Sequence, residues 1–470
     1  MKLNFEVKNF GKIQHAKLKL GAFSVVSGSN SSGKSFVTRA LYSYFSTINK
    51  DYITTEMLLS LNQIDELMRH GLYVTTAPSN NVIDLYYECN SSLEEIKNSI
   101  KADFQECTFL QQSTRMILLE KRLIDFEKNI TFFLAEVDGK KKYLNLNENL
   151  EIINIHLKQM KNIIKNPIDF LSQKYSIGFS ESLKENFQVA NLIDLHSHTI
   201  DIDSPISFNF GDLGNLSIKK ENVNLKLNGS AIEEFQSLYN VVFIESPIYW
   251  KLRKPLQMLR EFPFVRVRRL NREALGLTGV PKYFYDLMDL LSQNIKSNYN
   301  SSELFELYSN IINHLGGELD LSDSGDLMFK DALSQQNISL NLTATGVTNL
   351  GLIALLLKKN VISEGSFVFI DEPEVNLHPA WQKIMIETLY QLSLKGINVV
   401  IASHSIDMMK YIENIMNKLS DDEIEKHFAI NHLSRNGKSL DEDLSAKQTL
   451  IKIKEDLGLP FYEMMLENEW

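Results

Sequence analysis

Along residues 3–27, apolar and polar positions first alternate and then give way to a continuous apolar run. The segments LNFEVKNF and IQHAKLKL alternate with a period of two, which predicts two strands that each have one solvent-facing side. Gly11 and Gly21 follow these segments and predict turns. The next segment, AFSVVS, predicts a buried strand. The chain is therefore expected to begin with an antiparallel pair that leads into a buried strand.

From about residue 46 to residue 190 the spacing becomes helical. Apolar residues recur every three or four positions, with charged residues between them, in the stretches MLLSLNQIDELMRHGL, SSLEEIKNSIKADF, RMILLEKRLIDFEKNITFFL and LEIINIHLKQMKNIIK. We expect separate amphipathic helices of ordinary length, without the sustained heptad repeat of a long coiled-coil arm. Residues 205–230 alternate again and predict a small antiparallel sheet. Residues 281–318 predict another helical region.

Two apolar runs near the C-terminal end each stop at polar residues. The run 367–370 is followed by Asp371 and Glu372, and the run 397–402 is followed by the triplet Ser403-His404-Ser405. Both runs have the length and composition of buried strands. Ligands of open α/β sheets bind beyond the carboxyl ends of the strands. These polar residues are therefore expected to share one edge of a sheet with the end of the first buried strand.

Composition narrows the class of protein. A chain of 470 residues is too long for one simple core, so more than one domain or a large insertion is expected. A net charge of −10 argues against nucleic-acid binding through bulk charge. The only two cysteines, Cys89 and Cys107, fit a reducing compartment. No apolar run approaches the roughly 18 residues of a membrane span, and the first residues lack the apolar core of a signal peptide. We expect a cytoplasmic protein that does not enter the membrane.

Candidate chemistry begins with the loop after the first buried strand. Its sequence, GSNSSGKS, matches G-x-x-x-x-G-K-[ST] at every position. The nucleotide-binding candidates are Gly28, Ser29, Asn30, Ser31, Ser32, Gly33, Lys34 and Ser35. Small residues let backbone N–H groups turn inward around phosphate oxygens, and the following helix adds its N-terminal donors. Lys34 can reach the β- and γ-phosphates, and the Ser35 hydroxyl can bind Mg²⁺. The pattern predicts a site for ATP and Mg²⁺.

The two later strand ends supply the remaining groups of such a site. Asp371 can hold Mg²⁺ from the side opposite Ser35. Glu372 can accept a hydrogen bond from the attacking water. His404 can donate to the γ-phosphate and respond to hydrolysis. Glu372 and His404 are therefore the candidate catalytic residues.

These motifs, in this order, resemble the SMC/RecF-like branch of ATP-binding-cassette (ABC) ATPases. The matching residues are Gly28 to Ser35, the segment FIDEPEVNLHP and the segment IASHS. The wording DEPE-x-x-LHP is similar to that of compact bacterial AAA-type ATPases of antiphage systems. These include the ATPase subunits of PARIS and Septu and the ATPase part of overcoming-lysogenization-defect nucleases.

The resemblance implies a homo-oligomer in which two heads enclose two ATP molecules. Each nucleotide would be closed by a signature loop from the other subunit, for which the candidates are Thr345 and Gly346, although the usual serine-glycine wording is absent. Residues 376–378 would lie in the loop that crosses to the partner. The glutamine of the family's Q-loop has no clear counterpart; Glu245-Ser246 follows a suitable strand.

The expected fold is α/β, an ABC/SMC-like head with a mixed sheet and a large, mainly helical insertion. We expect residues 1–45 and 330–435 to form the head, residues 46–330 the insertion, and residues 436–470 a tail that packs on the head or on a partner. Only 66 residues follow His404, and we expect them to leave no room for a TOPRIM nuclease domain. The resemblance then implies a separate effector chain, often a nuclease, controlled by this ATPase.

Three alternatives remain open at this stage. A RecF-like repair ATPase would bind nucleic acid through the basic segment 251–272, which includes Arg266, Arg268 and Arg269, although the segment is also explained by a solvated helical face. A transporter ATPase would need a membrane partner, and the DEPE-x-x-LHP wording speaks against it. His196 and His198 stand in an acidic loop and suggest a metal site, although H-x-H without cysteines is usually only a loop.

Overall fold

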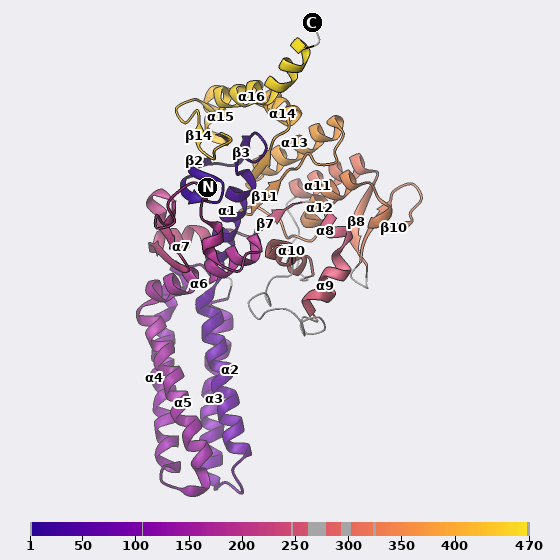
Figure 1. Ribbon diagram of the computed structural model, residues 1–470. Coiled ribbons are helices and arrows are strands. Elements are labelled where there is room, and N and C mark those ends of the chain that lie inside the picture. Colours follow the sequence, from indigo (N-terminus) through magenta and orange to yellow (C-terminus); the bar gives the residue numbers. More distant parts are fainter. Residues whose placement is uncertain are drawn as a thin grey trace, which may run out of the picture. The chain divides into compact units, whose positions relative to one another are not determined.

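The computed structural model describes residues 2–105, 107–245, 248–261, 279–292, 302–322 and 326–467 (Figure 1). The chain divides into two compact units. The first unit contains residues 1–49, 176–226 and 238–470, and the second contains residues 50–175 and 227–237. The fold class is α/β, as predicted, with a mixed sheet and a helical insertion.

The centre of the first unit is a six-stranded sheet. Its strands are, in order across the sheet, β14 (Ser439–Leu440), β13 (Phe428–Leu433), β3 (Phe23–Gly28), β12 (Asn398–Ser403), β11 (Phe367–Asp371) and β7 (Val241–Ile244). All neighbours are parallel except β14 and β13. The strands β3, β11 and β12 are buried along their whole length, which explains why their sequences are continuous apolar runs.

The register of these strands brings the predicted strand ends together. Ser27 pairs with Ser403 between β3 and β12, and Asp371 pairs with Ala402 between β11 and β12. Because the strands are parallel neighbours, their carboxyl ends lie at the same edge of the sheet. The prediction that three sequence-distant strand ends share one edge is confirmed.

A second, antiparallel sheet flanks the first. Its order is β2 (Ile13–Leu20), β1 (Leu3–Phe10), β4 (Ile206–Asn209), β5 (Gly214–Lys219) and β6 (Asn222–Leu227). The sequence predicted a small separate sheet for residues 205–230. The strands of this segment instead extend the sheet that begins with the N-terminal hairpin. The physical reason is a shared apolar face, because the Phe5 ring packs on Phe208 and Phe210.

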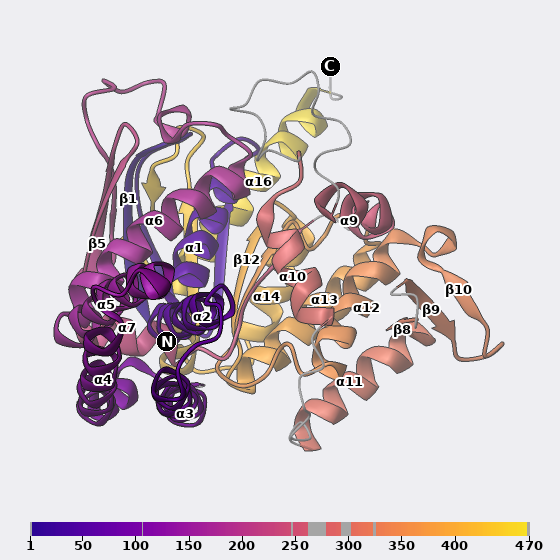
Figure 2. The same ribbon diagram turned by 90° about the horizontal axis from the view of Figure 1, so that it is seen from below.

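Helix α1 (Lys34–Ile48) lies between the two sheets, as Figure 2 shows for the space between β1 and β12. Its Tyr44 ring stacks on Phe210 of the antiparallel side with the centroids 3.8 Å apart. On the other side, its Phe45 ring meets Phe367 of β11 at 4.8 Å. A helix covered on two sides must be apolar on two sides, which accounts for the dense run of aromatic residues after the phosphate loop.

The rest of the first unit surrounds this core. Its helices are α8 (Ile248–Lys251), α9 (Arg253–Glu261), α10 (Lys282–Ser292), α11 (Ser302–Leu315), α12 (Thr345–Lys358), α13 (Pro379–Leu394), α14 (Ile406–Met416), α15 (Asp421–His427) and α16 (Ala446–Glu467). Short 3₁₀ turns lie at η2 (Leu192–Leu195), η3 (Gly211–Leu213) and η7 (Leu340–Leu342). A three-stranded sheet has the order β10 (Asn337–Ser339), β9 (Leu327–Asp331), β8 (Gly317–Leu321). The C-terminal helix α16 packs on α14 and β13 of the same unit.

The second unit is built from four long helices that pack side by side (Figures 1 and 2). They are α2 (Tyr52–Tyr73), α3 (Asn80–Asp103), α4 (Phe109–Val137) and α5 (Leu144–Lys165), with the turn η1 (Lys141–Tyr143) and the short helix α7 (Gly229–Gln236). The boundary to the first unit falls inside α6 (Pro167–Phe187). Helix α4 has 29 residues and buries positions at alternating four- and three-residue intervals from Gln112 to Val137. The expectation that a sustained heptad spacing is missing was therefore wrong.

The unit boundaries also differ from the expected insertion of 46–330. Strand β4 pairs with β1 of the N-terminal hairpin, β5 pairs with β4, and β7 pairs with β11 in the central sheet. These strands are therefore part of the first unit, because strand pairing ties them to its sheets. Over the described ranges, no helix is both long enough and apolar enough to cross a membrane.

Candidate nucleotide site

The loop from Gly28 to Ser35 joins β3 to α1. Gly28 has a φ of 156°, and a Cβ atom there would lie 2.2 Å from the Leu433 carbonyl oxygen. Gly33 has a φ of 96°, and its Cβ would lie 2.4 Å from the Ile13 side chain. Both positions need glycine, for backbone angle and for space. Gly33 is also the N-cap of α1 and supplies no side-chain cap, and the first turn carries no acidic residue. The N-terminal donors of α1 are therefore suited to an anion.

Lys34 is the first residue of α1 and is buried, with 6% of its surface exposed. Its Nζ donates to the carbonyl oxygens of Gly28 and Ser29, each at 3.0 Å. Burial lowers the pKa of Lys34, while the carboxylates of Glu372 and Asp371 oppose that shift. The ammonium group thus sits inside the loop, next to the acidic end of β11.

Ser35 and Asp371 meet directly. The Ser35 hydroxyl donates to Asp371 Oδ1 at 3.1 Å. Burial raises the pKa of Asp371 to about 7, with a further increase from nearby Glu245. A hydroxyl and a buried carboxylate are oxygen ligands of the kind that Mg²⁺ takes, and a bound cation would favour the ionised carboxylate. The two residues proposed as metal ligands therefore fit that ion.

Glu372 occupies an unusual backbone position at the end of β11. Its φ is 52°, in the left-handed region that a side chain rarely adopts. Its N–H donates to the Ala402 carbonyl at 2.9 Å, which continues the pairing of β11 with β12 by one residue. The side chain is 45% exposed, and its Oε1 lies 3.6 Å from His404 Nδ1. This geometry leaves a carboxylate partly open to solvent beside the phosphate loop.

His404 follows β12 and lies at the same edge. Its backbone N–H donates to Glu374 Oε1 at 3.0 Å, and its Nδ1 lies 3.3 Å from the same oxygen. Carboxylate oxygens of both Glu372 and Glu374 thus lie near the same ring atom, Nδ1. Sequence reasoning quoted Glu374 within DEPE-x-x-LHP but gave it no role.

The fourth strand end, that of β7, also contributes to this edge. The Glu245 carboxylate accepts hydrogen bonds from Arg39 of α1 and Tyr283 of α10. Glu245 and Arg39 act in opposite directions on the pKa of Asp371, which places both near that carboxylate. The neighbouring Ser246 lies outside the described residues. Arg39 was missed by sequence reasoning, although its position four residues after Ser35 puts it on the same helix face.

The signature candidates stand elsewhere in the first unit. Thr345 is the first residue of α12, and Gly346 follows it. A Cβ atom on Gly346 would lie 2.8 Å from the Leu377 side chain and 3.1 Å from the Asn376 carbonyl. The start of α12 therefore packs on the loop 376–378, so that the two segments expected to face a partner lie next to each other.

A family model described as an AAA ATPase domain matches residues 1–409. The chain belongs to this ATPase family. Its model includes the phosphate loop, Asp371, Glu372 and His404. No curated protein matches the chain.

Solved structures give only loose matches. The SMC head domain from Thermotoga maritima shares 10% identity, with 87% of this chain and 92% of that chain covered and a TM-score of 0.32. An Smc head domain from Pyrococcus furiosus, bound to the C-terminal domain of ScpA, shares 12% identity over 97% and 98% of the two chains at the same TM-score of 0.32. An Smc head domain with a coiled coil and joint from Pyrococcus yayanosii shares 12% identity. The match covers 97% of this chain and 99% of that chain, with a TM-score of 0.32.

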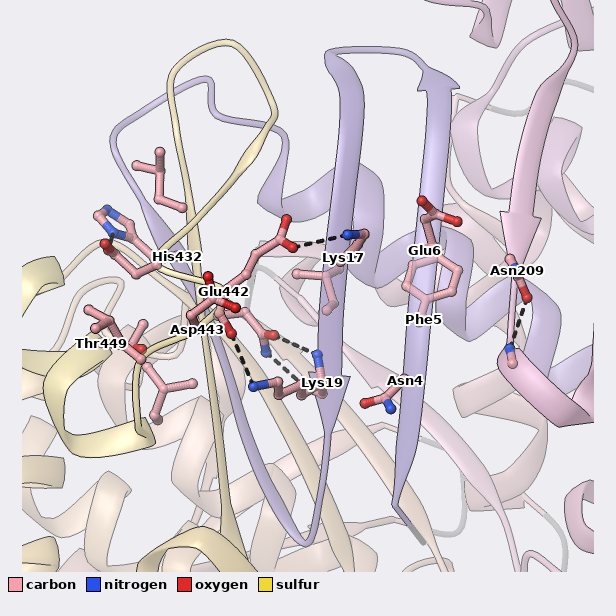
Figure 3. Close-up of a pocket in the computed structure, with 17 residues that line it drawn as sticks. Asn4, Phe5, Glu6, Lys17, Lys19, Asn209, His432, Glu442, Asp443 and Thr449 are labelled. Atoms are coloured by element: carbon pink, nitrogen blue, oxygen red, sulfur yellow. Dashed lines mark hydrogen bonds and ion pairs between the residues drawn. The ribbon is translucent and has the colours of Figure 1, made fainter.

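A prominent cavity of this ATPase, of about 370 Å³, is not the nucleotide site (Figure 3). It lies between the β1–β2 hairpin, β13 and residues 440–444 and contains none of the phosphate-loop residues. Several of its polar groups are bonded to one another. Lys17 pairs with Glu442 at 3.2 Å, and the backbone N–H of Lys19 donates to Asn431 at 2.7 Å. These bonds hold the hairpin, β13 and residues 440–444 together, so we interpret the cavity as a structural feature.

The metal site suggested by the histidines of the acidic loop is not supported by the surroundings of His196. His196 is buried, and its ring nitrogens face the carbonyl oxygens of Ser197 at 3.0 Å and Ser204 at 2.7 Å, which ties a loop together. Within the described ranges, no group of three ligating side chains is placed to hold a metal.

Half of the basic segment, residues 262–272, falls outside the residues that the structure describes. Arg266, Arg268 and Arg269 lie outside the described residues. Of those described, Lys251 donates to the Thr343 carbonyl at 3.2 Å, and Arg253 is buried. These two side chains turn into the protein and add nothing to an open basic face.

Proposed function

We propose that this chain binds ATP with Mg²⁺ and hydrolyses the γ-phosphate. The observation that carries the proposal is the meeting of Lys34, Ser35, Asp371, Glu372 and His404 around one edge of the central sheet. Two of these side chains have properties that ordinary surface residues lack: Lys34 is buried, and the pKa of Asp371 is raised. Perturbed titratable groups gather at functional sites.

The proposed roles follow from position and chemistry. The loop N–H groups and Lys34 bind the phosphates, and Ser35 and Asp371 hold Mg²⁺. When bound, the cation neutralises charge on the phosphate oxygens. Glu372, the half-exposed carboxylate, orients the attacking water and accepts its proton. His404 donates a hydrogen bond to the γ-phosphate.

We further propose that two copies of the chain close head to head on two ATP molecules. Thr345 and Gly346 would then act in trans, at the N-terminus of α12, on the nucleotide of the partner. In support, Gly346 packs against the loop 376–378, so one continuous surface carries both segments. Measuring the mass of the particle in solution, with and without ATP, tests the proposed dimer. We expect a dimer only when ATP is present and its hydrolysis is blocked.

The biological role that fits the DEPE-x-x-LHP wording best is that of an ATPase subunit in an antiphage system. It would act as a sensor or scaffold that controls a separate effector chain, which we expect to be a nuclease. The helical second unit offers a surface for such contacts. A RecF-like repair ATPase is the alternative, and salt-dependent DNA binding that weakens on neutralising Arg266, Arg268 and Arg269 would favour it.

The test of the hydrolytic function uses Glu372→Gln. We expect this variant to bind ATP with wild-type affinity and to release phosphate at least about 100-fold more slowly, because it loses the general base. Glu387→Gln on α13 is the matched control, since that carboxylate is exposed and pairs only loosely with Lys383 at 3.8 Å. Phosphate release by Glu372→Gln at the wild-type rate would contradict the proposal.

A further inference from the structure

Glu374 joins the turn after β11 to the end of β12. Its Oε1 accepts the Ser403 hydroxyl at 2.9 Å and the His404 backbone N–H at 3.0 Å. The same oxygen lies 3.3 Å from His404 Nδ1. One carboxylate oxygen therefore contacts both the backbone and the ring of the candidate switch histidine.

The position of Glu374 carries an energetic cost. The side chain is only 7% exposed, and its second oxygen, Oε2, is buried without a hydrogen bond in the described part of the chain. His404 Nδ1 is likewise buried and makes no hydrogen bond there. A buried acceptor without a donor has lost its hydration without gaining a hydrogen bond in return. Glu374 and His404 lie in contact, yet each has a buried polar atom without a partner within the described ranges. This indicates that the pair completes its hydrogen bonds in another state of the site.

The charge balance around Glu374 points to the same site. The carboxylates of Glu372, Asp371 and Glu374 all raise the pKa of Lys34, against the larger effect of burial, so the four groups share one neighbourhood. Glu374 is therefore within the field of the phosphate loop, although it makes no hydrogen bond to it among the described residues. Its direct contacts run to the β12 end.

We propose that Glu374 is a positioning residue that holds His404 for ATP hydrolysis. The inference rests on the proposed function. The carboxylate holds the His404 backbone through the N–H. In the ATP-bound state its Oε1, already 3.3 Å from Nδ1, takes a hydrogen bond from the ring, so that Nε2, on the opposite side of the ring, is the atom left to meet the γ-phosphate. A hydrogen bond from Nδ1 to a carboxylate is the usual way in which a protein selects the orientation and protonation pattern of an active histidine.

The turn geometry explains why this position, and not a neighbour, reaches His404. The Val375 N–H donates to the Glu372 carbonyl at 3.1 Å, which closes a turn over Pro373 and Glu374. The N–H of Glu372 remains paired with β12. Glu372 and Glu374 therefore leave the strand end in different directions, one toward solvent and one toward Ser403. In this proposal Glu372 orients the attacking water, whereas Glu374 orients His404.

The test is a double-mutant cycle of Glu374→Gln and His404→Ala in ATP hydrolysis. Glutamine keeps an oxygen for the two donors but removes the charge, so we expect normal folding and a KM for ATP within about threefold of wild type. We expect kcat to fall about tenfold or more, because a misaligned group loses transition-state contacts. In the His404→Ala background, Glu374→Gln should change kcat by less than about twofold, because residues that act as a unit are not additive.

Two controls keep the test decisive. Ser403→Ala removes the hydroxyl that helps to fix Oε1 and that also accepts the Ser405 N–H at 3.1 Å. It should give a smaller loss of kcat, again absent in the His404→Ala background. Glu387→Gln should change nothing. Additive losses in the cycle, an unchanged kcat for Glu374→Gln, or a loss seen only in KM would overturn the inference while the proposed ATPase stands. Absence of hydrolysis by the wild-type protein would instead overturn the proposed function, and this inference with it.

Discussion

Two polar regions of the first unit make opposite use of their charges. In the cavity of Figure 3, charged side chains pair with one another, as when Lys17 meets Glu442 at 3.2 Å and the buried His432 meets Asp441 at 2.8 Å. At the phosphate loop the charges remain unbalanced, with a raised pKa for Asp371 and a lowered pKa for Lys34. The comparison teaches that shifted pKa values, more than the volume of a cavity, distinguish the candidate nucleotide site.

The largest effect is expected from Lys34→Ala, at the phosphate loop. Removing the buried ammonium should weaken ATP binding by at least about 30-fold, because a buried charge pair that loses one partner costs 2–5 kcal/mol. Equilibrium titration with a fluorescent ATP analogue measures the effect. Lys383→Ala, at an exposed position of α13, is the control and should bind as wild type. Equal affinities for Lys34→Ala and the control would remove Lys34 from the site.

The second test exploits the cost of burying Asp371. In the unfolded chain an aspartate has a pKa of about 3.9, whereas in the folded protein the pKa of Asp371 is about 7. Below pH 4 both states hold the proton, and the residue is neutral to stability. Between pH 4 and pH 7 the unfolded chain releases the proton while the folded protein keeps it, so the free energy of unfolding falls across this range and levels off above pH 7.

Asp371→Asn should therefore stabilise the nucleotide-free protein at pH 8 and have little effect at pH 4. We expect a gain of about 1 kcal/mol or more at pH 8, since one pKa unit corresponds to about 1.4 kcal/mol. Denaturant unfolding of both proteins at the two pH values provides the comparison. A variant that is less stable than wild type at pH 8 would show that the buried carboxylate is fully compensated.

The smallest effect is expected in the cavity. Lys17→Ala breaks an ion pair whose partners are 56% and 40% exposed. Exposed pairs contribute about 0–1 kcal/mol, so stability should hardly change. The rate of ATP hydrolysis should stay within about twofold of wild type. A large loss of hydrolysis would mean that the cavity belongs to the working site and would remove the contrast between the regions.

Much of the site could be predicted from sequence because its signals are local. The apolar runs before Ser27, Asp371 and Ser403 identify buried strands, and parallel pairing then brings their ends together. The glycines of the phosphate loop are required by close contacts at Gly28 and Gly33, which a motif already records.

The remainder depends on contacts between distant residues. Pairing of β1 with β4 joins Val7 to Phe208, and alternation alone does not tell a strand which partner it takes. The link from Glu374 to His404, and the one from Arg39 to Glu245, likewise form only when separate strand ends meet. In α4, the heptad spacing is partly hidden by exposed apolar residues such as Ile117, Leu118 and Phe132, which blur the contrast between its faces.

The most direct test of the account is a crystal structure of Glu372→Gln with ATP and Mg²⁺. The account predicts the β- and γ-phosphates within hydrogen-bond distance of Lys34, the cation on Ser35 and Asp371, and the His404 ring facing the γ-phosphate. A nucleotide bound away from the Gly28–Ser35 loop, or a cation that touches neither Ser35 nor Asp371, would contradict it.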